Sequence, residues 1–188
     1  MKKTLLPLIL LMLLPSSSYA SNAGGFVAGL SHPVLGFDHL LAMLSVGILS
    51  AQMGGRSIWT VPATFVIVML FGGMLGIQGW PLFLVESGIA FSVLALGIAL
   101  SAEKKLSALI AMIFVGGFAL FHGYAHGSEI PSLANPVDYA TGFILGTACL
   151  HIMGVLIGLL AEKLQHGRQL LRYIGAGIAG IGFHLLIL

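Results

Sequence analysis

Six apolar segments of about twenty residues each follow one another along this chain of 188 residues, and they constrain its fold more than any other feature. A transmembrane helix needs about 20 mostly apolar residues to cross the hydrocarbon core of a bilayer. The composition agrees, since 58% of the residues are hydrophobic and only 7% are charged, whereas a soluble domain carries about a quarter charged residues. The sequence therefore predicts an all-α, polytopic membrane protein and excludes a soluble domain.

The predicted spans form one bundle, a single domain covering residues 21–188, with short loops. Their approximate bounds are 33–52, 57–77, 82–101, 106–126, 137–160 and 169–188. Pro33, Pro81 and Pro136 each suit a first helical turn, and Asn135 is a good N-cap. Glycine pairs four residues apart indicate close helix packing: Gly72/Gly76, Gly142/Gly146 and Gly154/Gly158. An inverted three-plus-three repeat is left open, because the two halves have little sequence similarity.

Residues 1–20 have the pattern of a cleaved signal peptide, although an uncleaved anchor is an alternative. Lys2 and Lys3 precede a short apolar stretch, and residues 18–20 end in a small-x-small pattern. Cleavage predicts a mature N-terminus near Ser21, on the periplasmic side of a bacterial cytoplasmic membrane. The basic residues of the mature chain all follow spans one, three and five, which the positive-inside rule places in the cytoplasm: Arg56, Lys104, Lys105, Lys163, Arg168 and Arg172.

Two clusters of histidines and carboxylates, HPVLGFDH and FHGYAHGSE, interrupt this apolar chain. Ionisable residues cost several kcal/mol at bilayer depth, so they usually mark an ion pathway, a proton relay or a ligand site. The clusters supply imidazole and carboxylate groups at His32, Asp38, His39, His122, His126 and Glu129. Two segments with the same ligand types predict that the protein handles a metal ion.

Helical spacing places part of these groups on common faces. His122, His126 and Glu129 are spaced i, i+4 and i+7 and share a stripe, unless Gly127 ends the helix and leaves Glu129 in a loop. His32 precedes a proline, which disfavours helical backbone, so it is expected to be a cap or loop residue.

Asp38 and His39 point about 100° apart, so one can bind an ion while the other orients it. The distance of each residue from the cytoplasmic end of its span follows from a rise of about 1.5 Å per residue. These distances form a descending series: about 30 Å for His126, about 24 Å for His122, about 20 Å for His39 and about 16 Å for His151. Asp38 and Glu86 lie at about 21–23 Å. Such a series suits ion access from outside. Glu86 and His151 are further candidate ligands, with a surface position and a helix–helix hydrogen bond as their respective alternatives.

The residue types indicate the class of metal. Imidazole with carboxylate suits nickel, cobalt, zinc, copper and iron(II), whereas calcium and magnesium prefer oxygen ligands alone. A single cysteine, Cys149, argues against copper(I) and iron–sulfur chemistry. We expect the metal to be a transported substrate, with no prosthetic group. The expected partners are this ion and the lipid bilayer, not nucleic acid, and a homo-oligomer is left open.

The two clusters resemble those of the HupE/UreJ family of bacterial nickel/cobalt permeases. HPVLGFDH matches the family signature HPxxGxDH, FHGYAHGSE matches its second motif, and the leader with six spans covers essentially the whole chain. The resemblance implies secondary uptake of Ni²⁺ or Co²⁺ across the cytoplasmic membrane. It also implies functional roles for the matched positions: His32, Asp38, His39, His122, His126 and Glu129.

Two other functions are left open by the residues alone. One is an intramembrane metalloenzyme in which a histidine-bound zinc activates water, and the other is a b-type haem protein with two histidine ligands. The chain has no P-loop, so it is not expected to hydrolyse ATP. The membrane potential alone favours inward movement of a divalent cation by about 4.6 kcal/mol per 100 mV. We therefore expect a secondary transporter rather than an enzyme, with uniport, channel-like and proton-coupled mechanisms all open.

Overall fold

The computed structural model describes residues 24–103, 106–130 and 135–188, and the predicted signal peptide lies outside these ranges. The described residues form helices and no β-strand. The helices are α2 (Gly25–Leu35), α3 (Phe37–Met53), α4 (Ser57–Ile77), α5 (Val85–Ala102), α6 (Ala108–Ser128), α7 (Pro136–Glu162) and α8 (Gly167–Ile187). Five of them, α4 to α8, are long and apolar enough to cross a membrane. The prediction of an all-α, polytopic membrane bundle is confirmed.

The helices α2 and α3 together are the sixth candidate span, and a break divides them. The two helices pass the test for a span together, but they are bent by 79°. The break lies at Gly36, whose backbone is extended (φ −82°, ψ 108°). Because Pro33 lies inside α2, His32 is helical, and the prediction of a cap or loop residue is wrong. The structure differs from the predicted span 33–52 in two ways, since helix begins earlier, at Gly25, and is interrupted at Gly36.

Two other helix ends differ from the sequence prediction. Helix α5 begins at Val85, not near residue 82, because Leu84 directly before it adopts the left-handed conformation (φ 58°), which is uncommon for a bulky residue. Helix α6 continues through Gly127 to Ser128, so Glu129 is its C-cap. The predicted cap of α7 is confirmed, since the backbone N–H of Val137 donates to Asn135 Oδ1 at 2.9 Å.

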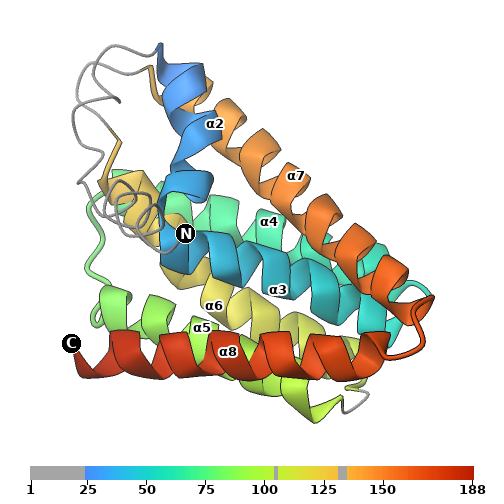
Figure 1. Cartoon of the computed structure of the whole chain (residues 1–188). Helices are drawn as coiled ribbons and strands as arrows, with labels where there is room; N and C mark the ends of the chain where they lie inside the picture. Colours follow the sequence, from blue (N-terminus) through green and yellow to red (C-terminus); the bar gives the residue numbers. More distant parts are fainter. Residues whose placement is uncertain (1–23, 104–105, 131–134) are drawn as a thin grey trace, which may run out of the picture.

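Four helix pairs form the main contacts of the bundle: α2 with α7, α3 with α7, α4 with α6, and α5 with α8. Helix α2 lies along the first part of α7, at the top of the view (Figure 1). Glycines allow the pairs to approach closely. A Cβ atom at Gly47 of α3 would collide with the His151 carbonyl of α7, and one at Gly123 of α6 with the Met69 carbonyl of α4. In an inverted three-plus-three repeat, α3, α4 and α5 would correspond to α6, α7 and α8. The observed pairings are compatible with such a repeat, because the α3–α7 pair would then correspond to the α6–α4 pair and the α5–α8 pair to itself.

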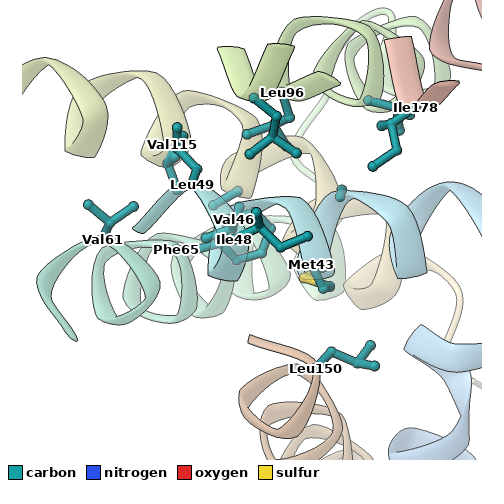
Figure 2. Packing of buried hydrophobic residues seen from close by; sticks show 14 of the residues in the cluster. Met43, Val46, Ile48, Leu49, Val61, Phe65, Leu96, Val115, Leu150 and Ile178 are labelled. Atoms are coloured by element: carbon teal, nitrogen blue, oxygen red, sulfur yellow. The ribbon is translucent and has the colours of Figure 1, made fainter. Parts of the chain in front are cut away.

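The apolar core lies around the second half of α3. Val46 and Leu49 of this helix are buried, and they belong to one cluster with Phe65 of α4, Leu96 of α5 and Val115 of α6. Figure 2 shows Val46, Ile48 and Phe65 gathered at its centre. His39 stands at the other end of α3, in its first turn. The bundle thus combines polar groups at one end with a closed apolar core beyond them.

Candidate metal-binding path

The four histidines of the two motifs form a continuous row between α2, α3 and α6. The ring centroids of His32 and His126 are 4.6 Å apart, those of His126 and His39 are 4.4 Å apart, and those of His39 and His122 are 4.7 Å apart. The bend at Gly36 makes this possible, because it turns α2 so that His32 reaches the ring of His126. Motifs about 90 residues apart in the sequence therefore meet in one site.

The exposed end of the row is a group of three residues that we call the mouth site: His32, His126 and Glu129. One ligand atom from each lies within 4.8 Å of the others. His126 is buried, whereas the side chains of His32 and Glu129 are 33% and 55% exposed. The Tyr139 hydroxyl of α7 is 2.9 Å from His32 Nδ1, so His32 Nε2 is left to face Glu129 Oε2 at 3.8 Å. Two imidazoles and a carboxylate are a suitable ligand set for nickel, cobalt or zinc.

The buried end of the row is His39 and His122, which we call the deep pair. His39 is 9% exposed and His122 is fully buried. His39 Nε2 and His122 Nδ1 have no hydrogen-bond partner, and neither ring nitrogen of His126 has one. A buried polar atom without a partner costs about 1–3 kcal/mol, and each such atom needs an explanation. A bound metal ion would supply the missing partner for these imidazole nitrogens.

Asp38 contacts His39 and orients its ring. Asp38 Oδ1 accepts hydrogen bonds from His39 Nδ1 at 2.8 Å and from the His39 backbone N–H at 2.7 Å. Because the carboxylate holds the proton on Nδ1, the lone pair of His39 is on Nε2. Histidines that bind metals commonly donate their other N–H to a carboxylate in this way, which fixes the tautomer and raises the basicity of the ligand. The sequence left open which residue of the pair binds, and the geometry favours His39.

His151 and Glu86 lie outside the row. His151 of α7 is buried, and neither of its ring nitrogens has a partner. The Phe65 ring contacts both this histidine (5.1 Å between centroids) and His122 (5.6 Å), so an aromatic ring separates His151 from the deep pair. Glu86 is exposed in the first turn of α5. Its exposure agrees with the alternative of a surface position, and its depth relative to Asp38 and His39 stays a prediction.

Glu86 acts instead on the mouth site through its charge. Burial raises the pKa of the Glu129 carboxyl above its ordinary value, and the negative charge of Glu86 raises that pKa further. The Glu129 side chain therefore takes up a proton more readily than an ordinary glutamate does. A divalent cation beside it would favour the charged form again.

Several residues of the site come from helices that carry neither motif. Ser92 of α5 contacts His122, Tyr139 of α7 contacts His32, and the Phe143 ring lies 4.0 Å from that of His126. A polar residue inside an apolar span was the available signal for Ser92. Tyr139 and Phe143 look like ordinary membrane residues in the sequence, and only the packing of α7 identifies them.

Fold and site together define a class of protein: an integral membrane protein whose helices bring a row of imidazoles and a carboxylate to one end of the bundle. Over residues 8–185 the chain matches the family described as HupE / UreJ protein, and it belongs to that family. The chain is 43% identical over 178 residues to Protein HupE of Rhizobium leguminosarum bv. viciae. The aligned region covers 93% of this chain and 92% of the relative. No solved structure matches the chain.

Membership of this family confirms the resemblance and settles the general class of activity. The family consists of permease-type transporters, and membership of it supports metal uptake as the general activity of this chain. The chain is therefore a membrane transporter and not an enzyme. The metalloenzyme alternative is excluded on this ground.

Proposed function

We propose that this protein takes up Ni²⁺, Co²⁺ or both from the periplasm into the cytoplasm through the row of histidines. The observation that carries the proposal is the row itself, in which buried imidazole nitrogens without partners follow an exposed carboxylate. Nitrogen and oxygen ligands of this kind suit divalent ions of the late first transition series. The resemblance of both motifs to those of nickel/cobalt permeases supports the choice of ions.

The exposure of the residues suggests an order of events. The mouth site is partly open and carries the carboxylate, so it attracts the hydrated cation first. The ion then moves to the deep pair, where His39 and His122 replace part of its water shell. An inside-negative membrane potential favours this direction by about 4.6 kcal/mol per 100 mV for a divalent ion.

Passage beyond the deep pair requires a rearrangement of helices. Phe65 and then the apolar core around Val46 and Leu49 follow directly after His122. An ion without its water shell finds no polar groups in such a core, which makes the described conformation closed on that side. We propose alternating access, with the predicted cytoplasmic half opening in a second conformation, as in transporters built from inverted repeats. His151, which lies beyond Phe65, is the next candidate ligand on this route.

Uptake by liposomes that contain the purified protein tests the proposal. With a potential negative inside, we expect Ni²⁺ or Co²⁺ to accumulate, and excess Ca²⁺ or Mg²⁺ to compete weakly. His39→Ala should abolish accumulation, whereas Asp138→Asn, an exposed carboxylate in the first turn of α7, serves as the matched control. Equal accumulation in empty liposomes, or full uptake by His39→Ala, would contradict the proposal. A haem absorption band in the purified protein would instead favour the b-type haem alternative.

A further inference from the structure

Ser92 is a fully buried serine near the middle of α5, outside both histidine motifs. Its Oγ lies 2.6 Å from the Ile89 carbonyl oxygen and 2.8 Å from His122 Nε2. A carbonyl oxygen can only accept a hydrogen bond, and a serine hydroxyl has one proton to donate. Ser92 therefore donates its proton to Ile89 and accepts a hydrogen bond from His122.

This pattern fixes the proton on His122. Since Ser92 Oγ accepts, His122 Nε2 must carry the hydrogen, and in the neutral ring the lone pair is then on Nδ1. Nδ1 is the ring nitrogen that is buried without a partner. His39 has the opposite arrangement, because Asp38 holds the proton on its Nδ1 and leaves Nε2 free. The two neighbouring rings thus present different nitrogens, each fixed by a separate residue.

We propose that Ser92 is a positioning residue that holds His122 in the Nε2–H tautomer, so that His122 binds the transported ion through Nδ1. The part that concerns metal binding rests on the transport function proposed above, whereas the tautomer is a property of the protein without metal. Residues that orient a metal ligand through its second nitrogen typically change metal affinity or activity by 10–100-fold when they are removed. Ser92 contacts the second nitrogen of His122, just as Asp38 contacts the second nitrogen of His39.

Ser50 of α3 provides a matched control. It is also fully buried, and its Oγ donates to the carbonyl of the residue three positions before it, Gly47, at 2.7 Å. The difference is that Ser92 also contacts a histidine. Ser50→Ala therefore removes the same kind of internal helix bond as Ser92→Ala and leaves the tautomer of His122 unchanged. Ser92→Thr keeps a hydroxyl at position 92, and threonine can likewise bond to a preceding carbonyl in a helix.

The test combines nuclear magnetic resonance and metal binding. The sample is purified, metal-free protein whose histidine rings are labelled with ¹⁵N. The signal of His122 is identified as the one that disappears in His122→Asn. This signal should have the chemical shifts of an Nε2–H tautomer. We expect Ser92→Ala to convert it to a mixture of tautomers and to lower the affinity for Co²⁺ at least about tenfold. Ser92→Thr should restore both, and Ser50→Ala should change neither.

The possible results separate the role of Ser92 from transport. An Nδ1–H tautomer in the wild-type protein overturns the inference, whether or not Ser92→Ala folds. An unchanged tautomer and affinity in Ser92→Ala also overturns it, and wild-type uptake would then leave the transport function standing. If the tautomer depends on Ser92 but the wild-type protein takes up no metal, the role of Ser92 is supported and the transport function fails.

Discussion

At the scale of single residues, the pair Asp38 and His39 shows most directly how a charged group is kept inside a membrane protein. Asp38 Oδ1 accepts two hydrogen bonds from His39, so the half-buried charge is partly compensated before any ion binds. We expect His39→Ala to abolish uptake and Asp38→Asn to reduce it about 10–100-fold at limiting metal, because an amide orients the ring less strongly. Accumulation of Ni²⁺ at low external concentration is the measurement, with membrane levels of each variant as the control. Normal accumulation by either variant would remove this pair from the path.

The raised pKa of the Glu129 carboxyl leads to a prediction of how metal binding depends on pH. Its raised pKa means that it becomes protonated at a higher pH than an ordinary glutamate, and metal ligands must be deprotonated. Binding of Ni²⁺ should therefore weaken as the pH falls from 7.5 to 5.5. Calorimetric titration should show weaker binding and a shallower pH dependence for Glu129→Gln, but not for the exposed Glu162→Gln. Equal affinity at both pH values would mean that this carboxylate is not a main ligand.

At the scale of elements, the break between α2 and α3 positions the site. Gly36 stands at the break, and a Cβ atom there would lie 3.1 Å from His39 Nδ1 and 3.3 Å from Asp38 Oδ1. Both contacts are tight, so Gly36→Ala should displace the Asp38–His39 pair and, because His39 belongs to the deep pair, lower the maximal rate of uptake several-fold. Gly117→Ala is the matched control, because a Cβ atom at Gly117 meets nothing within 4 Å. Unchanged uptake kinetics in Gly36→Ala would show that the pair tolerates movement and that the break does not position it.

Most of the elements could be predicted from the sequence because apolar segments of membrane length allow little else. Helix α4 has the bounds expected from its apolar run, residues 57–77. The broken first span could not be predicted in the same way, since a proline near a predicted helix start fits both a first turn and a helix interior. The start of α5 depends on the backbone conformation of Leu84, which has no local sequence signal. The six motif residues do meet in space, but Ser92 and Tyr139 belong to the site only through long-range packing.

At the scale of the whole molecule, the polar row and the apolar core divide the bundle into two unlike halves. The positive-inside pattern predicts that the row faces the periplasm, which requires the mature N-terminus on that side. We therefore expect the protein purified from membranes to begin near Ser21. Sequencing of its N-terminus measures this directly. A chain that still begins with Met1 would contradict the signal-peptide prediction and call for a new test of the orientation.

The central claim is that the ion passes from the mouth site to the deep pair, and concentration-dependent uptake by three single variants tests it most directly. Glu129→Gln and His126→Ala affect the mouth site, so they should raise the half-saturating concentration of Ni²⁺ and largely preserve the maximal rate. His122→Ala affects the deep pair, so it should lower the maximal rate even at saturating metal. The opposite result, in which His126→Ala is inactive at all concentrations while His122→Ala only shifts the half-saturating concentration, would contradict this order of sites.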